Sequence, residues 1–199
     1  MFKQSFTKQK NDKILWKDVL APTKIANQLF TYLPLDPSID IVFICIGTDR
    51  STGDSLGPLV GTFLQEKYFP SNFYIYGTIE SPVHAVNLQE TIDTINQNHQ
   101  RSFIVAIDAC LGQVKNVGTI EIKSGPLKPG AGVNKVLPLI GDIHITGIVN
   151  VSGYMEFFVL QNTRLFLVMQ LAKAITDGIY KAGLLYKYQL QVSKEETIS

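Results

Sequence analysis

Residues 39–46 read Ile-Asp-Ile-Val-Phe-Ile-Cys-Ile, and Gly47 closes this apolar run. The run is rich in β-branched residues and lacks the alternation of a strand that has one face in water. It therefore predicts a strand that is buried on both faces. Such strands are typical of parallel sheets, because helices cover both faces of these sheets. This one stretch indicates an α/β fold.

The same alternation of strand and helix continues along the rest of the chain. Apolar residues at helical spacing predict a helix between Pro22 and Pro34, and further helices over about 56–69, 85–97 and 153–180, the last as one helix or two abutting ones. Apolar runs predict strands at 73–79, 102–107 and 143–149, and alternation over 117–123 predicts a half-exposed edge strand. This order predicts a three-layer α/β sandwich with a mostly parallel twisted sheet.

The 199 residues are expected to form a single domain, because no internal repeat and no linker-like shift in composition divides them. Residues 1–20 are polar with scattered apolar positions, so we expect them to pack as an appendage. The polar residues 190–199 are expected to form a flexible tail.

Composition excludes several classes of protein. A net charge of +1 without a long basic run argues against a nucleic-acid binder. No apolar stretch reaches the roughly 18 residues of a membrane span, and the polar N-terminus predicts no signal peptide. Cys45 and Cys110 are too few for a disulfide framework or a zinc cage. We therefore expect a cytoplasmic protein without cofactor, metal, nucleic-acid or membrane partner.

Two carboxylates follow predicted strands. Asp54 lies in the loop GTDRSTGDSLGP (47–58), which follows the strand at 39–46, and Asp108 comes directly after the strand at 102–107. Ligands of open α/β sheets bind outside the carboxyl ends of strands, so the two carboxylates meet in one cleft if these strands are neighbours. Two partly desolvated carboxylates can share a proton and activate a water, or together hold a metal.

Each of these features also has another interpretation. Asp54 is a good residue for capping the N-terminus of a helix. The 47–58 loop is similar to phosphate-binding loops, but it lacks their glycine spacing and lysine ending, and its acid would repel a phosphate. Cys110 is a candidate nucleophile, although no histidine is close in sequence and Asp108 would raise the pKa of the thiol.

Taken together, the 47–58 loop and the segment IVAIDA (104–109) resemble the spore germination protease and its smaller sporulation relatives of the YyaC type. They are similar, more distantly, to hydrogenase maturation endopeptidases. The resemblance to the YyaC type covers about residues 22–188. It implies a phosphorylase/hydrolase-like fold, in which helices cover both sides of a twisted sheet. It also implies that Asp54 and Asp108 are the catalytic aspartates.

The resemblance extends to candidate substrate-binding residues. A glycine-rich segment of the family corresponds to KPGAGVNK (128–135), where Gly130 and Gly132 permit a tight loop whose N–H groups would receive a carbonyl or an anion. A plain turn is the alternative. Thr48 and Ser55 are the nearest candidates for positioning a tetrahedral oxygen, and His84 follows the strand at 73–79 and could face the same cleft. Of the other histidines, we expect His144 in the core or at a sheet edge and His99 in solvent.

The maturation endopeptidases bind metal through a glutamate, an aspartate and a histidine. These positions correspond to Asp54, Asp108 and, by eye, about Asn150. Asparagine is a poor ligand for a nickel-type ion, so this pattern argues against nickel recognition and favours the germination-protease side of the resemblance.

The sequence therefore predicts a sporulation peptidase in which one aspartate is the general base and the other the general acid. The resemblance implies small acid-soluble spore proteins or another sporulation protein as substrates, inside the sporulating cell or spore. The alternative is an inactive binding or regulatory protein on the same fold, favoured if the carboxylates lie more than about 8 Å apart or cap backbone. The oligomeric state stays open, because Tyr74, Tyr76 and Tyr186 would fit a subunit interface and a buried core equally well.

Overall fold

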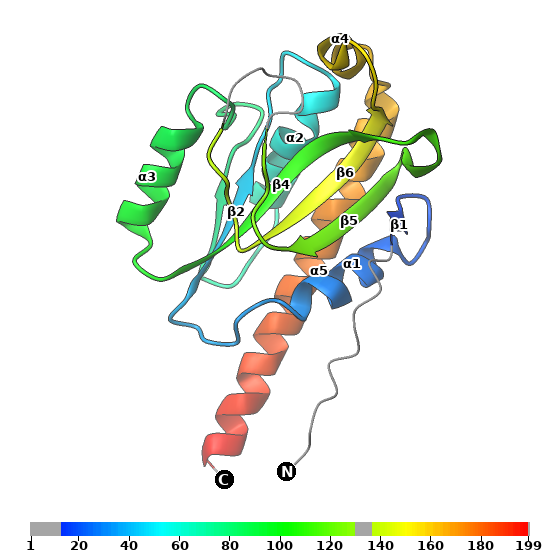
Figure 1. Ribbon diagram of the computed structural model, residues 1–199. Coiled ribbons are helices and arrows are strands. Elements are labelled where there is room, and N and C mark those ends of the chain that lie inside the picture. The colour runs from blue at the N-terminus through cyan, green and yellow to red at the C-terminus, as the bar shows by residue number, and fades with distance from the viewer. Residues whose placement is uncertain (1–12, 130–136, 199) are drawn as a thin grey trace.

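The computed structural model describes residues 13–129 and 137–198, which form a mixed sheet with helices on both faces (Figure 1). Within these residues the sheet has six strands in the order β1-β5-β6-β4-β2-β3. β3, β2, β4 and β6 are parallel, whereas β5 is antiparallel to β6 and to β1. The predicted fold class is confirmed. The strands are β1 (Ile14–Leu15), β2 (Asp40–Cys45), β3 (Phe73–Tyr76), β4 (Ser102–Gly112), β5 (Thr119–Ser124) and β6 (Ile143–Val151).

The helices form two unequal layers. α1 (Ala21–Phe30), α2 (Leu56–Gln65) and α5 (Leu165–Ile198) pack together on one face of the sheet, over the larger part of the core. α3 (Leu88–Asn98) lies on the opposite face, which we call the α3 face, over a smaller apolar cluster. Three short helices lie in the connections: η1 (Gly53–Ser55), η2 (Val114–Asn116) and α4 (Glu156–Gln161).

β2 shows why an unbroken apolar run marks this fold. Phe43 and Cys45 point into the larger core, and Val42 and Ile44 point into the cluster under α3. All four side chains are buried, because successive residues of a strand face opposite sides and both sides are covered here.

The strand that carries Asp108 is longer than predicted. β4 continues to Gly112, because residues 109–112 go on pairing with β6 as far as Val151. The prediction that Asp108 ends its strand is therefore wrong. The ladder between β2 and β4 nevertheless ends at the pair Cys45–Ile107, so Asp108 is the first residue of β4 that β2 does not cover.

The chain ends also differ from expectation. Ile14, within the predicted appendage, is buried and pairs with Ile120 as part of β1, which makes β5 the second strand from the edge. Residues 1–12 lie outside the described part of the chain. Residues 190–198, predicted as a flexible tail, form the last turns of α5. Across the described residues, no helix has the length and apolarity needed to cross a membrane.

The expectation that His99 is solvent-exposed is wrong. Its side chain is buried on the α3 face, where Nδ1 lies 2.8 Å from Asp40 Oδ2 and Nε2 lies 2.9 Å from the Tyr76 hydroxyl. The ring also packs against Tyr74. Tyr186 belongs to the core as well, and its hydroxyl oxygen accepts a hydrogen bond from Asn72.

Candidate active site

A cleft of ≈ 420 Å³ opens at the carboxyl ends of β2 and β4. Its polar lining comes from the loop after β2, from the loop after β3 and from β4, and consists of Thr48, Arg50, Ser51, Asp54, His84 and Asp108 together with Gln161 of α4. The rest of the wall is mainly apolar and comprises Ile46, Ala85, Ala109, Pro129, Leu137 and Phe157. Both predicted catalytic aspartates therefore face one cleft.

A single glycine lets the loop after β2 bring Asp54 to this cleft. The Gly47 N–H donates to Val83 O at 2.8 Å, and the Thr48 N–H donates to Asp54 O at 3.2 Å. Gly47 has φ +149°, and a Cβ there would lie 1.9 Å from Asp54 O. The loop can close over β2 in this way only because that position carries no side chain.

Asp54 lies in η1, immediately before α2, yet it does not act as a cap. Neither η1 nor α2 has a side-chain hydrogen bond at its N-cap, so the capping interpretation is wrong. Burial raises the pKa of Asp54, and the nearby Ser51 hydroxyl partly offsets that effect. Ser51 is itself buried, and among the described residues its oxygen has no hydrogen-bond partner of ordinary geometry. The Asp54 carboxylate is thus not used to cap either helix.

Asp108 is the more deeply buried acid of the two. It is only 9% exposed, and its Oδ1 accepts a hydrogen bond from the Ala109 N–H at 2.8 Å. Burial raises the pKa of Asp108 well above its usual range, the Ala109 N–H lowers it, and the charge of Asp54 raises it further. Burial therefore raises the pKa of Asp108 more strongly than that of Asp54.

Two of the predicted substrate-binding residues are found at the cleft. Thr48 lines it, and its hydroxyl accepts a hydrogen bond from the Arg50 N–H at 3.3 Å. His84 also lines the cleft, and its Nδ1 accepts a hydrogen bond from the Val86 N–H at 3.3 Å. That contact assigns the proton of a neutral ring to Nε2, so His84 can donate a hydrogen bond to a ligand.

Ser55 is not brought to the cleft. Its side chain is buried behind η1 and its hydroxyl donates to Thr52 O at 2.7 Å, so the role predicted for it does not fit its position. The physical reason is the turn of η1, which points Asp54 outward and the next residue inward. Gly130 and Gly132 lie outside the described residues.

Sequence reasoning missed several cleft residues, among them Arg50, Ser51, Phe157 and Gln161. Arg50 and Ser51 belong to the loop that drew attention to Asp54, and their position between its glycines was the available signal. Phe157 comes from α4, far along the chain from both aspartates. No local pattern marks it as a cleft residue, because only tertiary packing brings α4 against η1.

The residues of the cleft do not fit the three-ligand metal site of the maturation endopeptidases. Asn150 is engaged elsewhere: its amide donates to Thr163 Oγ1 at 3.2 Å, and its oxygen accepts a hydrogen bond from the Val151 N–H. Within residues 13–129 and 137–198, no group of three histidine, cysteine, aspartate or glutamate side chains is placed to hold a metal ion.

Cys110 is poorly suited to act as a nucleophile. Burial and, to a smaller extent, the charges of Asp108 and Glu121 raise the pKa of its thiol to about 11. Because the thiolate is the reactive form, this environment disfavours the cysteine-hydrolase alternative.

Comparison with known proteins identifies the family. The model of the family described as "Protein of unknown function (DUF1256)" matches residues 13–178. The chain belongs to this family. The uncharacterized protein YyaC of Bacillus subtilis (strain 168) is 54% identical over 162 residues, which are 81% of this chain and 78% of that protein. The resemblance to the YyaC type is confirmed.

The fold of this DUF1256 member is similar to the crystal structure of the [NiFe] hydrogenase maturation protease HycI from Thermococcus kodakarensis KOD1. The TM-score is 0.51 with 17% sequence identity, over 72% of this chain and 91% of that one. At this identity the likeness shows a shared fold. It confirms the predicted α/β architecture.

Proposed function

We propose that this protein is a peptidase in which Asp54 and Asp108 activate a water molecule for attack on a peptide bond. One observation carries the proposal: two carboxyl groups of unequal burial share one cleft, and the charge of Asp54 helps to raise the pKa of Asp108. Neighbouring acids with separated pKa values are the usual arrangement for paired acid and base catalysis.

The difference in burial assigns the two roles. Asp54, the less buried carboxylate, ionises first and is the general base that takes a proton from the attacking water. Asp108 keeps its proton and is the general acid that donates it to the leaving amine. The Ala109 N–H holds the Asp108 carboxyl in one orientation for this step.

Three further side chains are positioned to stabilise the negative oxygen of a tetrahedral intermediate. His84 offers its Nε2–H, Arg50 offers a guanidinium group and Thr48 offers a hydroxyl, and all three line the cleft. Donors of this kind lower the barrier most when they are already in place before the reaction.

The apolar wall of the cleft fits the side chain of a protein substrate next to the bond that is cleaved. Phe157, Leu137 and Pro129 form part of that wall. The motif resemblance supports the finer part of the proposal, that the substrate is a small acid-soluble spore protein or another sporulation protein.

A cleavage assay tests the proposal. The full chain should release peptides from fluorescein-labelled casein and, if the finer proposal holds, act faster on a purified small acid-soluble spore protein. Asp54→Asn and Asp108→Asn should each lower kcat/KM by about 10²–10⁴-fold. Asp93→Asn is the matched control, because Asp93 is exposed on α3 and lies outside the residues that line the cleft.

Two results would contradict the mechanism. One is cleavage at the wild-type rate in either the Asp54 or the Asp108 variant. The other is absence of cleavage by the wild-type chain on both substrates, which would favour the inactive binding protein on the same fold.

A further inference from the structure

A second, polar groove lies beside the two-aspartate cleft, on the part of the α3 face that α3 leaves open. Its volume is ≈ 600 Å³, and its lining includes Lys13, Cys110, Lys115, Glu121, Lys123 and Thr146. Figure 1 shows α3 over the β2 side of this face, whereas the described helices leave β5 and β6 uncovered there. We call this feature the lysine groove.

The lysine groove continues the row of side chains that begins at Asp108. Asp108 pairs with Thr146 of β6, and Thr146 pairs with Glu121 of β5, so the three residues form one row across three strands. Cys110 follows Asp108 on the same side of β4 and lines the groove. The cleft and the groove are therefore neighbours on this face of the sheet, since Asp108 lines one and Thr146, its partner in the row, lines the other.

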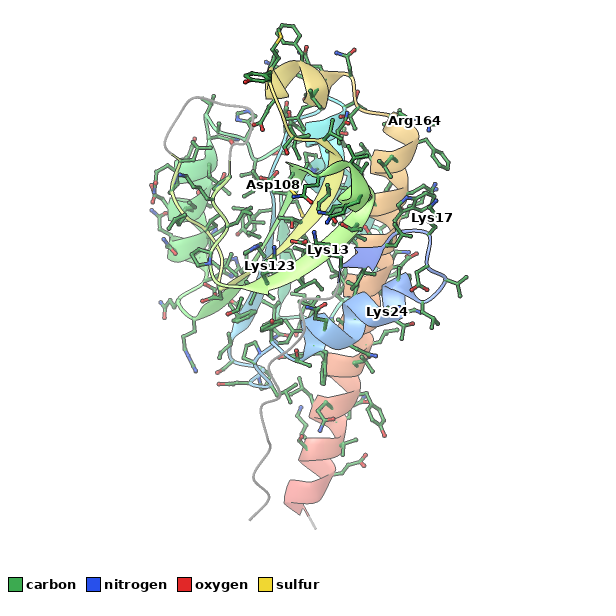
Figure 2. All side chains as sticks on the ribbon, turned by 45° about the vertical axis from the view of Figure 1, so that its right-hand side comes forward. Lys13, Lys17, Lys24, Asp108, Lys123 and Arg164 are labelled. Carbon is green, nitrogen blue, oxygen red and sulfur yellow. The ribbon has the colours of Figure 1, made fainter. Side chains whose placement is uncertain are left out.

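The charge of the groove is positive. Three lysines line it against one glutamate, and the Glu121 carboxylate already pairs with Lys123 and, at 3.2 Å, with Lys13. Lys115 is exposed on η2 and, in the part of the chain that the structure describes, has no carboxylate partner. Figure 2 shows Lys13 and Lys123 close below Asp108 in that view, whereas Lys24 belongs to α1.

We propose that the lysine groove binds an acidic stretch of the protein substrate. This inference rests on the proposed peptidase function, because it places the bond to be cleaved at Asp54 and Asp108. β4 and β5 are two strand intervals apart, which is about 10 Å, and an extended peptide advances about 3.3 Å per residue. The acidic residues would therefore lie about three to five positions from the cleaved bond.

Peptide binding tests this proposal directly. The probe is a fluorescein-labelled peptide of alternating Glu and Ala, with a peptide of the same length that carries Lys in place of Glu as its control. Anisotropy should show tighter binding of the Glu peptide by the full chain, and added salt should weaken it, because exposed charges are screened.

Lys115→Glu is the decisive variant, since removing this exposed and unpaired ammonium group leaves Glu121 paired. It should weaken binding of the Glu peptide about 3- to 10-fold, and adding Lys123→Gln should weaken it further. Lys17→Glu is the matched control, because it makes the same charge change at an exposed lysine outside the groove. Far-ultraviolet circular dichroism confirms that each variant is folded.

A cleavage experiment distinguishes failure of the groove proposal from failure of the proposed peptidase function. In substrates cleaved by the wild-type chain, moving the glutamates from three to five positions away to ten positions away should raise KM while kcat holds. The groove proposal would be overturned by equal affinity for the Glu and Lys peptides. It would also be overturned if Lys115→Glu and Lys17→Glu changed the affinity for the Glu peptide equally. If the chain cleaves no substrate but still binds the Glu peptide more tightly than the Lys peptide, the result would count against the proposed peptidase function and in favour of the groove proposal.

Discussion

Replacing Asp108 by asparagine should lower the proposed peptidase activity by about 10²–10⁴-fold and at the same time stabilise the protein at neutral and alkaline pH. The change removes a buried acid but keeps the oxygen that accepts the Ala109 N–H. Because burial raises the pKa of Asp108 in the folded state, the folded chain binds a proton that the unfolded chain has already released. The contribution of Asp108 to stability is then fully present below the unfolded pKa of about 3.9 and is lost as pH rises through the raised folded pKa.

The structure sets the size of the effect. At pH 8 the native Asp108 carboxylate must be accommodated with one N–H partner and with Asp54 beside it, which costs about 1–3 kcal/mol. For a chain of 199 residues, each kcal/mol changes Tm by about 2–4 °C. Asp108→Asn should therefore raise Tm by about 2–12 °C at pH 8, and by little near pH 4.

Thermal unfolding followed by circular dichroism at a series of pH values measures this difference. Asp49→Asn, at an exposed position, should change the free energy of unfolding by less than about 0.5 kcal/mol at any pH. An unchanged or lower Tm for Asp108→Asn at pH 8 would refute the reasoning. It would mean that Asp108 is well solvated or well paired when ionised, and then it could not serve as the general acid.

Two further changes test parts of the fold. His99→Ala removes the ring that contacts both Asp40 and Tyr76, so it should lower the free energy of unfolding by about 2 kcal/mol in urea titrations. A change within experimental error would contradict the buried network of these three side chains. Gly47→Ala should reduce both stability and kcat/KM, because its methyl group would meet a backbone oxygen of η1 at 1.9 Å, whereas Gly153→Ala, with open space around it, should leave both unchanged.

The main features of the fold and of the site could be predicted from local pattern. A β-branched run buried on both faces requires cover on both sides, so residues 39–46 alone indicate the layered sheet. The same logic placed Asp54 and Asp108 at one edge, since parallel strands bring their carboxyl ends together.

Strand length and edge position depend on partners that local pattern does not show. β4 runs past Asp108 because β6 extends beside it, and β1 joins the sheet because two residues near the N-terminus find β5. The burial of His99 has the same kind of origin, since its partners come from two other strands. None of these contacts leaves a periodic signal in the residues that make them.

The order of residues by itself determined the layered α/β architecture and the two acids at its edge, because burial on both faces and the side-chain period of a strand are local properties. Only the tertiary structure decided which carboxyl group has the more strongly raised pKa, which hydroxyl faces the cleft and which residues of α4 join the wall of the cleft. Those outcomes depend on how completely distant segments exclude water from a given group, and that is a property of the packed chain.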